Sequence, residues 1–163
     1  MGFNTLGWIK YSIDPENLVK LYGASEYEDG IYLRDMSQLI QSRINKLVQL
    51  KNDPDKNSKT YDLTFTVTTC KRFNLFKKTM DTILINYDNI DKIREFICVD
   101  DNSSDIDREA MLTTYPFFTF IMKNQSEKGH PKSMNIIMDV VKTKYNIHFE
   151  DDWNCNKPFD IKV

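Results

Sequence analysis

Apolar residues in the second part of the chain fall into two kinds of pattern that alternate along the sequence. Short runs rich in β-branched and aromatic residues, typical of buried strands, occupy 63–69, 95–99, 117–122 and 146–149. Apolar residues at helical spacing, which predict amphipathic helices, occupy 74–86, 106–113 and 131–144. Because strand and helix alternate, we expect an α/β fold with a mostly parallel, Rossmann-like sheet, right-handed crossovers and flanking helices.

The N-terminal part of the chain has a different pattern. Residues 1–33 mix aromatic residues with glycines, and we expect short strands or turns at 6–13 and 30–33 with a short helix at 15–22. From Asp35 the pattern is clearer, because apolar residues recur on one face of a predicted helix at Met36, Leu39, Ile40, Ile44, Leu47 and Val48.

Residues 51–60 contain no apolar residue other than Pro54. Such a polar segment is typical of a surface linker. It predicts a boundary between an N-terminal appendage, residues 1–60, and an α/β domain at residues 61–163.

Composition and charge narrow the functional classes. The formal net charge is −2 at pH 7 and no basic face is apparent, so we do not expect nucleic acid as a partner. No apolar run is long enough to span a membrane and no leader is visible at the N-terminus. Three cysteines at unrelated spacings favour reduced thiols in a cytoplasmic protein. His130 and His148 are isolated in the sequence and are expected to be structural.

Polar and acidic residues follow directly on three of the predicted strands. They are Thr68, Thr69, Cys70, Lys71 and Arg72 after the first strand, Asp100 and Asp101 after the second, and Glu150, Asp151 and Asp152 after the fourth. The carboxyl ends of parallel strands meet at one edge, where α/β proteins bind ligands. Two acidic groups there repel each other unless a cation or a donor-rich ligand joins them. An alternative is that Asp100 and Asp101 only cap the next helix.

Four segments in order carry a resemblance to a known family. Thr68-Thr69-Cys70-Lys71-Arg72, then Val99-Asp100-Asp101-Asn102-Ser103-Ser104-Asp105, then the segment 128–135 (Lys-Gly-His-Pro-Lys-Ser-Met-Asn), and then Glu150-Asp151-Asp152 resemble the N-terminal half of family 2 glycosyltransferases of the GT-A fold. The resemblance covers about residues 61–153. It implies a GT-A nucleotide-sugar-binding domain and a nucleotide sugar, most simply a UDP-sugar, as a partner.

The resemblance also implies roles for individual residues. Thr68 and Cys70 would line the base pocket, and Asp101 would accept a hydrogen bond from the imide nitrogen of uracil. Arg72 and Lys132 would contact the diphosphate, and Gly129 would allow close backbone approach. Further contacts to the nucleotide are implied at Thr69, Asp100 and Asp151.

The acidic segment 150–152 resembles the metal-binding Asp-X-Asp motif of this family. Hard divalent ions prefer carboxylate and phosphate oxygens, so the implied cofactor is Mn2+ or Mg2+. Asp152 is the first choice as a metal ligand and Asp151 the second. The ion would neutralise the diphosphate leaving group.

The hypotheses differ in whether the chain is catalytic. Family members continue beyond the acidic motif, whereas this chain stops eleven residues after Asp152, at Val163, and the part that activates the acceptor is expected to be absent. The leading hypothesis is therefore a glycosyltransferase or its donor-binding half, acting on an unknown acceptor. The alternative is an incomplete GT-A domain that serves as a binding or interaction module. A homo-oligomer is possible on either hypothesis.

Two other nucleotide-binding classes fit less well. A sugar nucleotidyltransferase needs a glycine-rich loop after the first strand, and Thr-Thr-Cys-Lys-Arg-Phe has no glycine. A dinucleotide-binding domain needs a Gly-X-Gly-X-X-Gly segment, which follows none of the strands. The richness in Asn, Lys, Ile and Asp suggests an AT-rich genome, such as that of a large DNA virus or a low-GC bacterium.

Overall fold

A computed structural model describes residues 29–163, with side chains from Met36 onward. The elements in chain order are α3 (Asp29–Lys51), α4 (Lys56–Lys59), β1 (Tyr61–Thr69), α5 (Phe73–Asn86), η1 (Ile90–Lys92), β2 (Ile93–Asp100), α6 (Asp105–Thr114), β3 (Thr119–Met122), η2 (Gln125–Glu127), α7 (His130–Val140) and β4 (Tyr145–Glu150). The strand expected at 6–13 and the helix expected at 15–22 lie outside the described residues.

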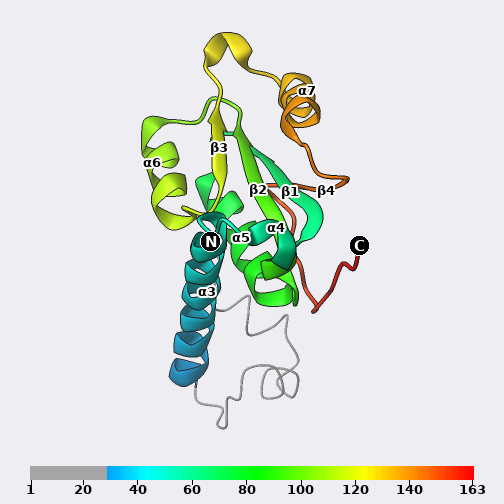
Figure 1. Cartoon of the computed structure of the whole chain (residues 1–163). Coiled ribbons are helices and arrows are strands. Elements are labelled where there is room, and N and C mark those ends of the chain that lie inside the picture. The colour runs from blue at the N-terminus through cyan, green and yellow to red at the C-terminus, as the bar shows by residue number, and fades with distance from the viewer. Residues whose placement is uncertain (1–28) are drawn as a thin grey trace.

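The four strands form one sheet in the order β3-β2-β1-β4, and every pair is parallel (Figure 1). In the centre, Thr68 of β1 pairs with Val99 of β2 and with Glu150 of β4. The predicted α/β fold with a parallel, Rossmann-like sheet is confirmed. All four strands therefore end at the same edge of the sheet. After β3 the chain continues from that edge into η2 and α7.

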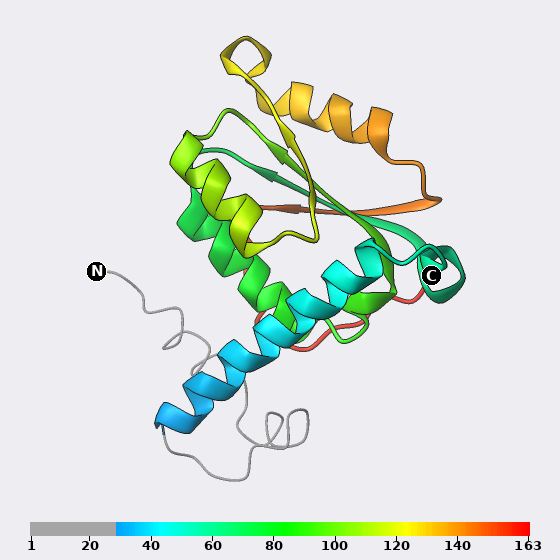
Figure 2. The ribbon, with the colours of Figure 1, turned by 60° about the vertical axis from the view of Figure 1, so that its left-hand side comes forward.

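Helices lie on both faces of the sheet (Figure 2): α5 and α6 cover one face and α7 packs on the other, against β1 and β2. Successive side chains of a strand point to opposite faces, and β1 shows the division clearly. Phe65 and Val67 enter the main hydrophobic core, whereas Thr64 and Thr66 hydrogen-bond to polar groups of the β4 region. The two faces of the sheet are therefore chemically different.

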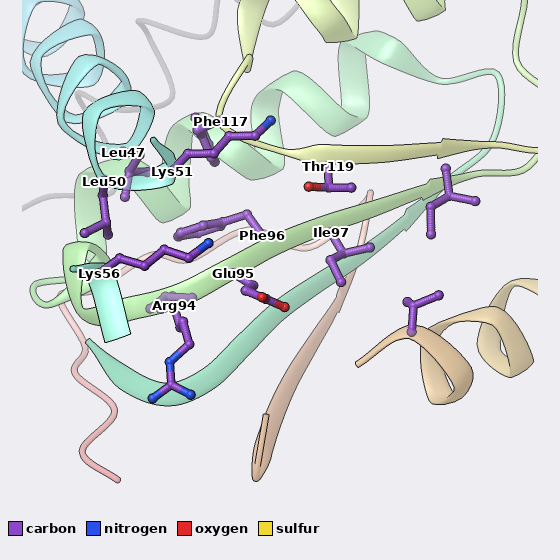
Figure 3. A pocket seen from close by; sticks show the side chains of 13 residues that line it. Leu47, Leu50, Lys51, Lys56, Arg94, Glu95, Phe96, Ile97, Phe117 and Thr119 are labelled. Atoms are coloured by element: carbon purple, nitrogen blue, oxygen red, sulfur yellow. The ribbon is translucent and has the colours of Figure 1, made fainter. Parts of the chain in front are cut away.

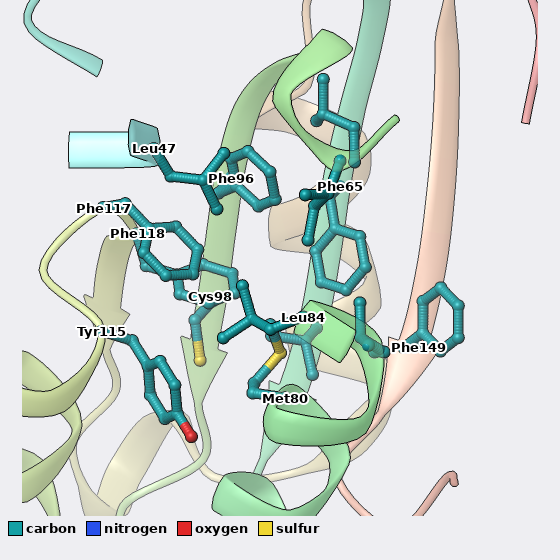
Figure 4. Packing of buried hydrophobic residues seen from close by; sticks show 14 of the residues in the cluster. Leu47, Phe65, Met80, Leu84, Phe96, Cys98, Tyr115, Phe117, Phe118 and Phe149 are labelled. Carbon is teal, nitrogen blue, oxygen red and sulfur yellow. The ribbon is translucent and has the colours of Figure 1, made fainter. Parts of the chain in front are cut away.

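The core on the α5 face is built largely from aromatic rings (Figure 4). Phe65 stacks on Phe149 with ring centroids 5.2 Å apart, and Phe96 meets Phe117 edge to face at 5.1 Å. Full burial of each ring stabilises the fold by roughly 1.5–3 kcal/mol. These rings come from four separate segments, so the cluster fixes β1, β2, β4 and the turn before β3 relative to one another.

Helix α3 packs on α5 and η1, and its Ile44 and Leu47 belong to the same hydrophobic cluster as the sheet residues. Arg43 donates to the carbonyl oxygens of Leu84 and Tyr87 at 2.7 Å each, at the end of α5. The boundary expected near residue 60 stays a prediction. Within the described part of the chain, no helix combines the length and the apolar character that crossing a bilayer requires.

Three expectations about local structure were wrong. Residues 30–33, expected as a strand or turn, belong to α3, which begins at Asp29 rather than Asp35. Leu33 is three residues before Met36 and seven before Ile40, so it continues the apolar spacing of the helix, and extending an existing helix is easier than starting one. The segment 51–60, expected as linker throughout, contains the short helix α4.

The third error concerns the element boundaries around β3 and α7. The strand expected at 117–122 begins only at Thr119, because Phe117 and Phe118 form the turn after α6 and are buried there by packing. An apolar run shows burial but not strand pairing. Helix α7 ends at Val140 rather than near residue 144, and the next four residues lead into β4.

Candidate functional site

A pocket of about 260 Å³ lies where the strands end. Its lining residues are Thr68, Thr69, Cys70, Arg72, Asp101, His130, Ser133, Glu150 and Asp151. They come from the carboxyl ends of β1, β2 and β4 and from the first turns of α7. Six of the residues that the sequence resemblance assigns to nucleotide binding therefore meet in one place, namely Thr68, Thr69, Cys70, Arg72, Asp101 and Asp151.

Asp101 is a buried carboxylate held by donors from two directions. Its Oδ1 accepts from Lys123 Nζ at 2.8 Å and from the backbone N of Gly129 at 2.9 Å, and its Oδ2 is 3.1 Å from the same Gly129 nitrogen. Burial opposes its ionisation, but the hydrogen bonds from Lys123 and Gly129 and the charges of Lys123 and Lys128 outweigh it and lower the pKa of Asp101. Asp101 is therefore an ionised acceptor in the pocket.

Asp100 lies on the other face of the sheet and does not line the pocket. Its carboxylate has no exposed surface, and its Oδ2 accepts from Arg108 Nε at 2.8 Å and from Ser103 N at 3.1 Å. Neither acid caps α6, because that cap is Ser104, whose side chain accepts from Asp107 N. The expected nucleotide contact of Asp100 stays a prediction, and its described partners belong to the turn and to α6.

Asp151 is 1% exposed and fills the wall of the pocket between β1 and β4. Its Oδ2 accepts from Thr69 Oγ1 at 2.8 Å and from Cys70 N at 3.3 Å, while Oδ1 forms an ion pair with Arg72. Its carbonyl oxygen also accepts from Thr79 Oγ1 of α5 at 2.8 Å. These contacts make Asp151 a link between strand tips.

Asp152 differs from Asp151 in exposure and in partners. Its side chain is 47% exposed, and Arg72 Nη1 lies 3.4 Å from its Oδ2. No group of three or more His, Cys, Asp or Glu side chains suitable for a metal ion occurs among the described residues. Mg2+ and similar ions are commonly held by one or two carboxylates with phosphate and water as the other ligands. Asp152 fits that pattern, whereas both oxygens of Asp151 already have partners.

The cations expected to contact a diphosphate lie in different positions. Arg72 lines the pocket and bridges Asp151 and Asp152. Lys132 does not line it, and its Nζ donates to the carbonyl oxygen of Ser126 at 2.8 Å. A role for Lys132 in binding diphosphate therefore stays a prediction that requires its side chain to turn.

Three residues of the site were given no binding role from the sequence: His130, Ser133 and Lys123. His130, expected to be structural, lines the pocket beside Ser133, and its Nε2 lies 4.0 Å from Oε1 of Glu150 in the acidic segment. Lys123 lies behind Asp101 with only 1% of its side chain exposed. Lys123 comes directly after β3, so extending the inspection of strand ends to the third strand would have found it.

The loops that shape the pocket include three positive φ angles. Lys71 has φ 55° and Asn102 has φ 65°, and the backbone N of Lys71 donates to Ser103 Oγ at 2.7 Å, which joins their two loops. Gly129 has φ 132°, and an added Cβ would meet no atom within 4 Å. Glycine is therefore needed there for its backbone conformation, and the turn aims the Gly129 nitrogen at Asp101.

His148 is the one histidine with a structural environment. Its Nδ1 lies 3.0 Å from Thr66 Oγ1 of the neighbouring strand. Burial lowers its pKa, with the nearby Glu150 acting in the opposite direction and His130 acting in the same one. His148 is therefore neutral at pH 7. It fits the expected structural role, whereas His130 lies in the wall of the pocket.

A second pocket, of about 320 Å³, lies away from the strand tips (Figure 3). It runs beside the first half of β2, because β3 pairs only from Ile97 onward. Leu47 and Leu50 of α3 and Phe96 of β2 give it apolar walls, and Lys51 and Arg94 add positive charge. Lys51 Nζ is already used, since it donates to the carbonyl oxygen of Phe118 at 2.7 Å. We assign no chemistry to this pocket.

Comparisons with known proteins yield a fold similarity. No protein-family model matches the sequence, and no curated protein is significantly similar to it. The structure is similar to that of the mannosyltransferase PcManGT from Pyrobaculum calidifontis in complex with GDP-Man and Mn2+, with 17% sequence identity and a TM-score of 0.45. The match covers 72% of this chain and 36% of the mannosyltransferase chain. A similarity of this degree assigns neither a family nor an activity.

Proposed function

We propose that this chain binds a nucleoside diphosphate sugar together with a divalent metal ion, as the donor-binding half of a GT-A glycosyltransferase of family 2. The observation that carries the proposal is the convergence at one pocket. Three segments chosen from the sequence for their resemblance to that family, which are far apart in the chain, place Thr68, Asp101 and Asp151 around the same cavity. A parallel sheet brings its strand ends to one edge in any case, so the support lies in these particular side chains lining the cavity.

The chemistry of the pocket suits the base end of such a donor. Asp101 is an ionised acceptor, and uracil presents an imide N–H between two carbonyl groups. The pocket is slightly smaller than the roughly 300–1,000 Å³ of typical small-molecule sites. It would enclose the base and part of the ribose, with UDP as the preferred nucleotide and the diphosphate toward Arg72 and Asp152.

Asp152 would hold the metal ion, Mn2+ or Mg2+, with the diphosphate supplying further oxygens. When bound, the ion would supply positive charge to the leaving diphosphate. Arg72 would then exchange its contact with Asp152 for one with a phosphate, since its side chain is 45% exposed and its guanidinium suits phosphate geometry. Thr69 and Cys70 would keep Asp151 in place throughout.

A non-catalytic binding module is the second candidate. The hydrogen bonds of the two most buried acids in the pocket favour it. Asp101 and Asp151 each accept from at least two donors of the protein itself. A general base needs free access to the proton that it removes. On this alternative the chain would bind the nucleotide sugar, or another partner, without transferring the sugar.

Calorimetric titration with UDP tests the proposal. We expect binding that is strengthened by Mn2+, because the ion bridges Asp152 and the diphosphate. AMP serves as a control nucleotide that lacks both the imide N–H and the second phosphate. Failure to bind UDP with or without Mn2+ would contradict the proposal and favour an interaction module.

A further inference from the structure

Lys123 is a buried cation whose three donors are all used. Only 1% of its side chain is exposed, and its Nζ donates to Asp101 Oδ1 at 2.8 Å, to the Gly129 carbonyl oxygen at 2.9 Å and to Ser133 Oγ at 2.8 Å. An ammonium group has three N–H donors, so none is left for a ligand. Lys123 therefore ties the end of β3 to Asp101 and to the first turn of α7.

The two oxygens of Asp101 are used unequally. Oδ1 accepts from both Lys123 and Gly129, whereas Oδ2 has only the longer contact of 3.1 Å to Gly129. Each carboxylate oxygen can accept about two hydrogen bonds. Because Asp101 lines the pocket, the acceptor position that remains on Oδ2 is the one that a ligand can use.

We propose that Lys123 is a positioning residue that sets the base selectivity of the pocket by keeping Asp101 a pure hydrogen-bond acceptor. A pure acceptor binds bases with a ring N–H donor, as in uracil and guanine. It rejects cytosine and adenine, which present an unprotonated ring nitrogen at the same edge. The inference rests on the proposed function and adds the residue that controls which class of nucleotide enters.

Other charged and titratable groups around Asp101 do not replace Lys123. They are Cys70 and Arg72 after β1, Asp100 at the end of β2, Arg108 on α6, Lys128 after η2, His130 at the start of α7, Glu150 at the end of β4 and Asp151 after it. Arg72 and Arg108 are paired with other acids. Without Lys123, only the Gly129 hydrogen bond and the charge of Lys128 oppose the effect of burial on Asp101, so its pKa would be higher and more of it would be protonated as the pH falls. The protonated form donates a hydrogen bond and accepts cytosine.

Calorimetry on the whole chain, with UDP and CDP at the same Mn2+ concentration, measures this selectivity as the ratio of the two dissociation constants. For the wild-type chain we expect UDP to bind at least about tenfold more tightly, the effect of one hydrogen bond to a charged group, with a constant ratio from pH 8 to 5.5. For Lys123→Met we expect the ratio to fall about tenfold, mostly at pH 5.5, as the protonated Asp101 tolerates cytosine. In an Asp101→Asn background, Lys123→Met should leave the ratio unchanged.

Results that contradict the role of Lys123 can be told apart from a result that contradicts nucleotide binding itself. Equal weakening of UDP and CDP by Lys123→Met would show a role in folding alone and overturn the inference while leaving the proposed function intact. A wild-type ratio that falls between pH 8 and 5.5 would overturn it without any variant. Should Lys123→Met not fold, Lys123→Gln, which keeps a donor but removes the charge, should lower the ratio in the same way. A wild-type chain that binds neither nucleotide would overturn both proposals.

Discussion

Asp100 and Asp101 are consecutive in the chain, yet their carboxylates bind cations on opposite faces of the sheet. Asp100 accepts from Arg108 of α6 at 2.8 Å, and Asp101 accepts from Lys123 at 2.8 Å beside α7. The alternation of side chains along a strand extends to its last residue and to the one after it. One acid of the pair therefore holds the turn to α6, and the other faces the pocket.

Asp101→Asn should weaken UDP binding about tenfold or more, with and without Mn2+. The amide leaves Lys123 without its charged partner and replaces an acceptor that the imide N–H would use. Isothermal calorimetry provides the measurement. Asp105→Asn is the matched control, because Asp105 is an exposed acid four residues further on, and it should bind UDP as the wild-type chain does. Equal effects of the two variants would contradict the role of Asp101.

Asp151 and Asp152 should respond differently to removal. Asp152→Ala should abolish the strengthening of UDP binding by Mn2+ and change the free energy of unfolding little, because its side chain is 47% exposed. Asp151→Ala should destabilise the chain by about 1–3 kcal/mol, since Thr69 and Cys70 N lose their acceptor. Urea denaturation and calorimetry on both variants make the comparison. A metal effect that survives Asp152→Ala would rule out Asp152 as the ligand.

Arg108→Met should destabilise the fold by about 2–4 kcal/mol, because it leaves the fully buried carboxylate of Asp100 without its cation. Urea denaturation measures the change. The double variant Arg108→Met with Asp100→Asn should recover part of the loss, since it removes the unpaired charge. A double variant no more stable than the single one would show that Arg108 acts mainly through its other partner, the carbonyl oxygen of Lys123.

The pH dependence of stability should include a contribution from His148. Burial lowers its folded pKa below the ordinary value of 6.5, so the unfolded chain binds a proton first as the pH falls. The neutral histidine therefore contributes stability above pH 6.5 that is lost as the pH falls toward the folded pKa. Urea midpoints measured between pH 7.5 and 5 should fall less in His148→Gln than in the wild-type chain. Identical slopes would contradict this contribution.

The sheet could be predicted from the sequence because its strands are marked by runs of apolar residues between helical patterns. The same rule failed for Phe117 and Phe118, which are buried in a turn, because hydrophobicity reports burial and not backbone pairing. The start of α3 was missed because Gly30 and the aromatic residues near it are typical of turns as well.

The site was only partly predictable for a related reason. Residues at the strand tips could be placed at one edge, and alternation along a strand puts Asp100 and Asp101 on opposite faces. The sequence does not say which of the two faces carries the pocket, so it does not say which acid lines it. Lys123 has no motif around it, and its burial arises from partners 22, 6 and 10 residues away in the chain.

The most direct test of the central claim is to locate the bound Mn2+ in the chain by nuclear magnetic resonance. In the presence of UDP, paramagnetic broadening by Mn2+ should be strongest for the backbone amides of Cys70, Arg72 and Asp152 at the carboxyl ends of β1 and β4. The amides of Tyr61 and Ile93, at the opposite ends of their strands, should be broadened little. Broadening centred on Tyr61 and Ile93, or none that depends on UDP, would contradict a nucleotide and metal site at the strand tips.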